Sequence, residues 1–147
     1  MNVITKQVEE KPFTVTIEYP ILDHKARDLI KKIKSLDFKV TGNSNGKWYS
    51  LSISDIFYIE AVERKTFIYT EKEIYVSEKK LYELEEMLNE TGIVRISKSC
   101  LMNMEVLLSV RQLLNSQLEA TMINGEKLLI ARTYLKNIKK ILKEGTQ

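Results

Sequence analysis

The sequence predicts a mainly β protein, α+β overall, in which packed antiparallel sheets carry a small number of helices. Three observations predict this class. Short segments rich in β-branched and aromatic residues follow one another from position 47 onward and alternate apolar with polar side chains. Short polar breaks separate them, including the hairpin-forming pair Asn124-Gly125. Only the stretches 23–36, 81–88 and 133–142 have helical periodicity.

Residues 1–45 are expected to form a strand–helix extension. Thr14–Tyr19 alternates in the manner of a half-buried strand, which Pro20 ends. Asp23 can cap a helix with one apolar face, formed by Ala26, Leu29, Ile30, Ile33 and Leu36. The run Gly42–Gly46 consists of turn formers and marks either a domain boundary or a hairpin. We predict that this extension is a dimerisation or regulatory element.

Residues 46–147 are expected to form the β-rich domain. Its strands are predicted at 47–53, 56–62, 66–70, 74–76, 93–96, 107–110, 117–123 and 127–130. A short helix carries Leu81, Leu84 and Leu88, with Ser77 as its expected cap and Thr91-Gly92 as its end. A final helix, capped by Thr133, is expected to turn its apolar residues inward, namely Leu135, Ile138 and Leu142.

Composition bounds the environment and the partners. The chain of 147 residues has ordinary hydrophobic content, 44%, and no apolar run that approaches the ~20 residues of a membrane span. The charged residues near the N-terminus argue against a secretion signal, so we expect a cytoplasmic protein. The net charge of +3 is small, but residues 127–143 contain six basic and no acidic residues. Residues 78–90 contain five glutamates. This separation is typical of a protein oriented on a polyanion, or simply of solvated helix faces.

Catalytic chemistry finds little support in the sequence. His24 is the single histidine, in the first turn of an expected helix, and Cys100 is the single cysteine, flanked by apolar residues. Neither a phosphate-binding glycine loop nor a nucleophile or zinc-protease motif is present. We therefore expect no enzyme activity, no metal site, no cofactor and no small-molecule substrate.

Basic residues lie instead in the expected breaks between strands. Arg64 and Lys65 fall in one break, Arg95 and Lys98 flank a polar corner, and Arg132 precedes the last helix. Arginine and lysine in loops can contact DNA phosphates or read guanine edges in the major groove. Each of these loops taken alone is more often a solvated loop, but three together form a reasonable DNA surface.

Four ordered blocks of the sequence resemble the LytTR family of DNA-binding domains. Ile56–Ala61 with Thr66–Tyr69 resembles its "YIEA" segment, and Leu81–Leu88 resembles its "L-x-E-L-E-x-x-L" helix. Val94–Asn103 is similar to its "F-x-R-x-H-[RK]-S-x-x-V-N" core, and Asn124–Tyr134 to "NGEx-(V/I)-x-SRRY". Ser97 stands where the family often has histidine, and Ala131-Arg132-Thr133 keeps one basic residue where two are usual.

The resemblance implies packed antiparallel sheets whose loops, rather than a recognition helix, enter successive major grooves of double-stranded DNA. It further implies transcription regulation in a bacterium, commonly by two copies of the chain on paired repeats, and hence a homodimer. The DNA contacts that it implies lie in three segments and comprise Arg64, Lys65, Thr66, Lys98, Arg132 and Thr133. We expect their neighbours Arg95, Ser99 and Lys136 to contact DNA as well.

The first 45 residues are too few for the receiver domain that many members of this family carry. The chain therefore resembles the stand-alone branch of the family, whose members are often controlled by a membrane-protein partner. The alternative function is a protein-interaction module, with the N-terminal extension or the acidic segment 78–90 as the docking face.

Overall fold

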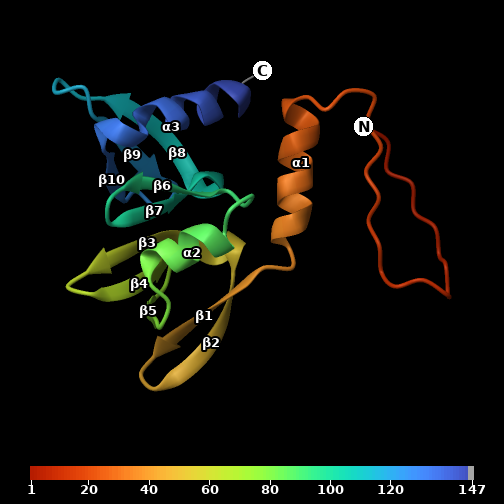
Figure 1. Cartoon of the computed structure of the whole chain (residues 1–147), viewed down its shortest axis with the longest axis horizontal. Helices are drawn as coiled ribbons and strands as arrows, with labels where there is room; N and C mark the ends of the chain where they lie inside the picture. The colour runs from red at the N-terminus through yellow and green to blue at the C-terminus, as the bar shows by residue number, and fades with distance from the viewer. Residues whose placement is uncertain (146–147) are drawn as a thin grey trace.

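The computed structural model describes residues 1–145 and contains two antiparallel sheets and three α-helices in that range (Figure 1). The elements are α1 (His24–Ser35), β1 (Lys39–Ser44), β2 (Lys47–Ser52), η1 (Ile53–Asp55), β3 (Ile56–Val62), β4 (Lys65–Thr70), β5 (Ile74–Ser77), α2 (Leu81–Met87), β6 (Ile93–Ser97), β7 (Cys100–Asn103), η2 (Met104–Val106), β8 (Leu107–Gln112), β9 (Leu118–Met122), β10 (Lys127–Ile130) and α3 (Arg132–Gly145). The mainly β fold class expected from the sequence is confirmed.

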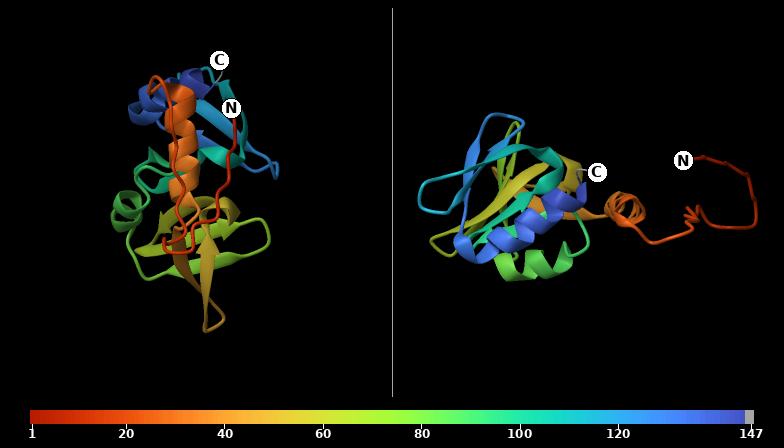
Figure 2. Two further views of the ribbon diagram at one scale, coloured as in Figure 1. Left: turned by 90° about the vertical axis from the view of Figure 1, so that its right-hand side faces the viewer. Right: turned by 90° about the horizontal axis from the view of Figure 1, so that it is seen from above.

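The larger sheet has seven strands in the order β2-β1-β5-β4-β3-β7-β6, and the smaller has three in the order β10-β9-β8. All neighbouring strands are antiparallel. The β1–β2 hairpin forms the lower end of the β-rich body in Figure 1, and the smaller sheet with α3 forms its upper end. α1 stands to one side of both sheets, and the N-terminal segment lies beyond it (Figures 1 and 2).

β3 and β7 are covered on both faces, which gives the protein two hydrophobic cores. Ile59 of β3 and Leu101 of β7 point into the first core, which also holds Leu84 of α2. Tyr58 and Met102, the preceding and following residues, point into the second core, between the two sheets and α3. Successive side chains of a strand face opposite sides, so these two strands connect the layers.

Asn103 fixes the end of β7 to the start of β3 inside the protein. Its fully buried amide donates hydrogen bonds to the carbonyl oxygens of Ile53 and Ile56, at 3.1 and 2.7 Å, and its side-chain oxygen accepts one from the amide of Glu105 at 3.0 Å. A buried amide is tolerated because its donors and its acceptor are satisfied.

Three expectations from the sequence are wrong. Thr14–Tyr19 forms no strand, because within residues 1–145 no other strand lies beside it. Ser77 does not cap α2: it ends β5 and accepts a bond from the amide of Lys79, and the helix begins after Lys80. Thr133 lies in the first turn of α3 rather than at its cap.

Other expectations are confirmed or extended. Asp23 caps α1 by accepting a hydrogen bond from the amide of Ala26 at 2.9 Å, and this bond holds the pKa of the Asp23 carboxyl below its usual value. The sequence left open whether Gly42–Gly46 is a domain boundary or a hairpin. In the structure this run belongs to the hairpin that joins β1 to β2. β1 therefore belongs to the large sheet although it precedes position 45. β7 is a strand that the sequence did not indicate.

Candidate nucleic-acid interface

The β3–β4 turn is a tight two-residue connection that projects basic side chains. Val62 pairs with Lys65, and Glu63 and Arg64 between them adopt left-handed backbone conformations, with φ of 49° and 68°. Such conformations cost non-glycine residues on the order of 1 kcal/mol or more each. The two-residue turn therefore holds Glu63 and Arg64 in an unfavourable backbone conformation. Arg64 and Lys65 are exposed, whereas Thr66 is buried at 5% exposure. The Thr66 side chain is therefore not available at the surface of this turn.

The β6–β7 turn is held by a side chain of β6. Arg95 donates a hydrogen bond from Nη1 to the carbonyl oxygen of Lys98 at 3.1 Å, and its Nε lies 3.4 Å from a carboxylate oxygen of Glu85 on α2. The amide of Ser99 donates to Ser97 Oγ at 3.2 Å, which closes the turn. Lys98 and Ser99 are exposed at its tip. Arg95, in contrast, is engaged in contacts within the protein.

The start of α3 carries the third basic segment. Arg132 donates from Nε and Nη2 to the carbonyl oxygen of Asn115, which lies in the connection between β8 and β9. Thr133 and Lys136 are exposed, and Lys136 lies one helical turn after Arg132, so the two share a face of α3. The contribution of Asn115 was not anticipated, because an uncharged polar turn gives no signal of a basic site.

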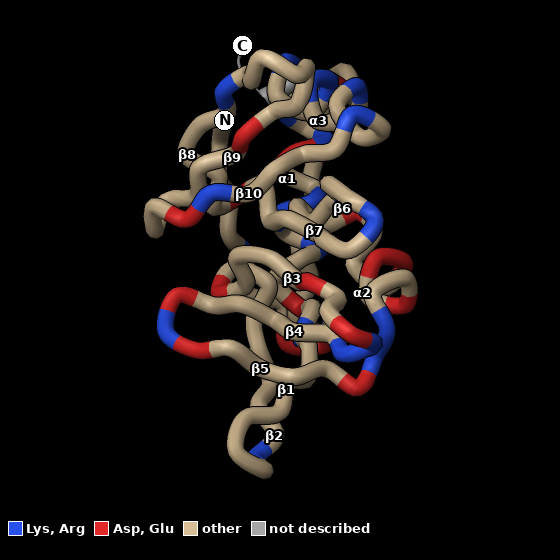
Figure 3. Tube along the Cα trace, turned by 90° about the vertical axis from the view of Figure 1, so that its left-hand side faces the viewer, with Lys and Arg blue, Asp and Glu red and all other residues tan. Residues whose placement is uncertain are grey.

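Backbone hydrogen bonds bring these three segments to one side of the protein. The amide of Ala61, near the end of β3, donates to the carbonyl oxygen of Ser99 at 2.8 Å. The amide of Ala131 donates to the carbonyl oxygen of Ile96, also at 2.8 Å. The β6–β7 turn therefore lies between the β3–β4 turn and the start of α3. In Figure 3, β3–β4, β6–β7 and α3 follow one another along the side that faces the viewer.

The basic side chains of this surface are not neutralised within the protein. Among the ion pairs of residues 1–145, none includes Arg64, Lys65, Lys98, Arg132 or Lys136. Arg95 alone of the predicted basic residues forms one. Five exposed cations without a carboxylate partner are therefore available on this side to contact phosphates.

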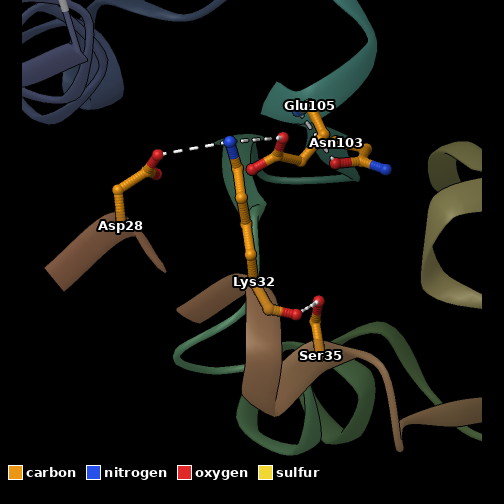
Figure 4. Close-up of polar contacts among 5 residues, drawn as sticks. All are labelled: Asp28, Lys32, Ser35, Asn103 and Glu105. Atoms are coloured by element: carbon orange, nitrogen blue, oxygen red, sulfur yellow. Dashed lines mark hydrogen bonds and ion pairs between the residues drawn. The ribbon is translucent and has the colours of Figure 1, made fainter. Parts of the chain in front are cut away.

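A separate cavity of about 350 Å³ lies between α1 and the β-rich body. Lys32 of α1 crosses it: its ammonium lies 3.3 Å from a carboxylate oxygen of Asp28 and 4.0 Å from one of Glu105 (Figure 4). The hydrogen bond to Asp28, followed by the charge of Glu105, raises the pKa of Lys32. The cavity is lined by none of the predicted DNA-contacting residues.

Neither a metal site nor a membrane span is found in the described part of the chain. Residues 1–145 contain no group of three or more histidine, cysteine, aspartate or glutamate side chains arranged to hold a metal ion. No helix among them combines the length and apolar character needed to cross a bilayer. Every buried side-chain nitrogen or oxygen of these residues has a hydrogen-bond partner.

Packed antiparallel sheets that present basic turns and a basic helix start define the class of β-rich nucleic-acid-binding domains. Comparison with known proteins identifies the family. The model of the LytTr DNA-binding domain matches residues 46–143, which is more than half of the chain, and the chain therefore belongs to this family. Residues 39–44, which form β1, precede the matched region although they pair with β2.

Curated relatives match the chain over part of their own length. The sensory transduction protein LytT of Bacillus cereus is 31% identical over 93 residues, which cover 63% of this chain and 38% of the relative. LytT of Bacillus subtilis is 25% identical over 137 residues, covering 84% of this chain and 57% of the relative. The chain thus spans little more than a third to somewhat over half of these proteins.

A solved structure has the same fold. The LytTr DNA-binding domain of a protein described as a methyl-accepting/DNA response regulator from Bacillus cereus superposes with a TM-score of 0.67 at 24% sequence identity. The match covers 71% of this chain and 95% of the solved one. The matched part of the chain therefore has the fold of a known domain.

Proposed function

We propose that the chain is a sequence-specific DNA-binding transcription regulator. Its β3–β4 turn, β6–β7 turn and the start of α3 contact successive major grooves, and two copies occupy paired repeats. The observation that carries this proposal is the convergence of five unpaired cations on one side of a domain whose family binds DNA. Lys98 and Arg132 are the proposed base-reading residues, and Arg64, Lys65 and Lys136 are proposed to contact phosphates.

We propose secondary roles in DNA binding for Arg95, Ser99 and Thr133. Ser99 and Thr133 are exposed beside Lys98 and Arg132 and can add hydroxyl contacts to the backbone of the DNA. Arg95 holds the turn in which Lys98 stands, so we assign it primarily to positioning.

A salt titration of binding to a selected site tests the proposal. Sites are first enriched from random double-stranded DNA, and fluorescence anisotropy then measures affinity at several salt concentrations. Neutralisation of about six phosphates gives a slope of log affinity against log salt of roughly −5. The expected specific binding exceeds that of a scrambled duplex at each salt concentration. Equal affinity for the selected and scrambled duplexes throughout would contradict the proposal.

A second candidate function, control by a protein partner through α1, is favoured by the way this helix is attached. Lys32 reaches Glu105, and Lys34 lies 3.3 Å from Glu90, so exposed ion pairs join α1 to the body beside an open cavity. Exposed pairs are weak and are screened by salt, so a partner could displace the helix. Co-expression with membrane proteins encoded beside the gene, followed by co-purification with wild-type and Lys32→Ala, Lys34→Ala chains, tests this control. If neither the wild-type chain nor the variants capture such a membrane protein, control through α1 is contradicted.

A further inference from the structure

The N-terminal segment Phe13–Tyr19 has the pattern of a strand and no strand partner. It alternates apolar with polar side chains and contains four consecutive β-branched residues, Thr14 to Ile17. In the structure it belongs to neither sheet, and Phe13 and Val15 are 98% and 51% exposed. Its one side-chain hydrogen bond among the described contacts is local, from Thr14 Oγ1 to the carbonyl oxygen of Pro12. A segment of this composition is stabilised by pairing with a sheet edge.

The strand β2 offers such an edge. Its register with β1 is continuous from Lys47 to Ser52, and on its other side no strand of residues 1–145 is paired with it. Edge strands are normally protected by bulges, prolines or charges. β8 has both a bulge after Leu107 and the charged Arg111, whereas β2 has neither bulge nor proline and one charge, at Lys47.

The apolar surface beside this edge is also uncovered. Trp48 is 56% exposed and pairs with Asn43, which in turn pairs with Val76 of β5. Val76 pairs with Phe67 of β4, so the row continues across the sheet on one face. Val76 is 40% exposed. The free edge therefore adjoins the exposed apolar side chains of Trp48 and Val76, which a further strand would help to shield.

We propose that residues 13–19 of a second copy pair with β2 as an additional strand, each copy giving and receiving one. Pro12 and Pro20 bound the segment and, lacking an amide proton, would end the ladder on both sides. The seven residues between them are enough to pair along all six residues of β2. All four apolar side chains, at 13, 15, 17 and 19, fall on one face of the added strand, and we place this face on the side of Trp48. Reciprocal exchange closes a two-fold dimer.

The geometry of α1 favours a second copy over the same chain. The segment joins α1 at its N-terminal end through residues 20–23, which span at most about 14 Å. The nearest end of β2, Ser52, pairs with Lys39, which follows the other end of this helix of 12 residues, about 18 Å away. α1 lies between the segment and the sheets in Figures 1 and 2. Because the segment lies on the far side of α1 from β2, pairing with a second copy leaves α1 in its place against the body.

Trp48, the single tryptophan of the chain, reports directly on this edge. The experiment follows sedimentation and tryptophan emission of the full chain over a concentration series without DNA. We expect a monomer–dimer transition and a blue shift of emission with the same midpoint, because the added strand shields Trp48. Ile17→Pro should stay monomeric with unshifted emission, since proline interrupts the ladder. Gln7→Pro, the matched control outside the segment, should behave as wild type.

This strand exchange rests on the proposed function, in which two copies bind together. Because the experiment contains no DNA, a failure to dimerise can be distinguished from a failure to bind DNA. It is overturned if the wild-type chain stays monomeric, if Ile17→Pro dimerises like wild type, or if dimers form without a Trp48 shift. A blue shift that is independent of concentration and lost in Ile17→Pro would assign the strand to its own chain and overturn the exchange. If the chain dimerises with the expected Trp48 shift but binds no DNA specifically, the proposed function is contradicted and the strand exchange is not.

Discussion

The guanidinium of Arg132 is fixed by the backbone of Asn115, whose carbonyl oxygen accepts hydrogen bonds from both Nε and Nη2, at 3.2 and 2.8 Å. Arginine has five N–H donors, so three of them stay available for a ligand. The contact joins the start of α3 to the β8–β9 connection, 17 positions earlier in the chain. It orients a charged side chain before DNA arrives and reduces the entropy lost on binding.

Substitution of Arg132 should separate charge from orientation. Arg132→Ala removes both, and we expect a loss of about 1–3 kcal/mol in binding to the selected site. Arg132→Lys keeps the charge but not the planar fork that holds Asn115, so it should retain affinity for scrambled DNA while losing specificity. Anisotropy with both duplexes measures this. Wild-type specificity in the lysine variant would show that the fork is not needed.

Lys98 should contribute to binding without contributing to folding. Its side chain is exposed at the tip of the β6–β7 turn and has no ion pair within residues 1–145. Lys98→Ala should leave the unfolding free energy unchanged and weaken binding to the selected site by about 1–3 kcal/mol. If Lys98 contacts only a phosphate, the magnitude of the salt slope falls by about 0.9 for each bound copy and all duplexes weaken alike.

The matched control for Lys98 is Lys72, which is exposed in the β4–β5 connection. Lys72→Ala changes the net charge by the same amount at a site away from the three basic segments. It should therefore leave the affinity for the selected duplex nearly unchanged. An equal loss in both variants would mean that total charge, rather than the position of Lys98, determines binding.

The sequence predicted the strands that have a clear local pattern, and it failed where strand formation depends on tertiary contacts. β3 and β4 were found because their strands contain β-branched and aromatic residues in alternation and end at a polar turn. β7 was missed because both of its faces are buried, which gives Cys100–Met102 a continuous apolar run without alternation. Thr14–Tyr19 has the right alternation, but β propensity forms a strand only beside another strand.

The candidate site was predicted residue by residue but not as an arrangement. Its basic residues are visible in the sequence because they stand in polar breaks between strands. Their convergence depends on bonds between distant segments, such as Ala131 to Ile96 and Arg132 to Asn115. The burial of Thr66 and the engagement of Arg95 with Glu85 likewise follow from packing, which a single sequence does not reveal.

Arg95 should affect DNA binding through the turn that it holds. Its side chain is 19% exposed, and Arg95→Ala removes the bond to Lys98 and the ion pair with Glu85, so we expect unfolding to become easier by about 1–2 kcal/mol. A double-mutant cycle with Glu85→Ala should give a coupling of about 0.5–1 kcal/mol. The DNA affinity of Arg95→Ala should fall while the salt slope stays constant. A slope that decreases would instead make Arg95 a phosphate contact.

Cys100 should be chemically silent in the folded protein and should make stability depend on alkaline pH. Burial in β7, followed by the charge of Glu60, raises the pKa of its thiol from 9.0 to about 12. At pH 8 the thiolate is then rare, and we expect a disulfide reagent to react at least about 100-fold more slowly than with an exposed thiol. Ser99→Cys in a Cys100→Ala background supplies that exposed thiol one position away. Equal rates in the two proteins would contradict the burial.

The pH dependence has a definite sign. Between the unfolded pKa near 9 and the folded pKa near 12, the native state keeps a proton that the unfolded state has lost. Stability attributable to Cys100 is therefore complete below pH 9 and decreases as the pH rises, by up to about 1.4 kcal/mol per pH unit. Urea unfolding of wild type and Cys100→Ala at several pH values between 8 and 11 isolates this contribution, because the alanine chain lacks the thiol but keeps every other titrating group. The difference in unfolding free energy between the two proteins should narrow with rising pH, and a difference that stays constant over this range would show that the thiol titrates alike in both states.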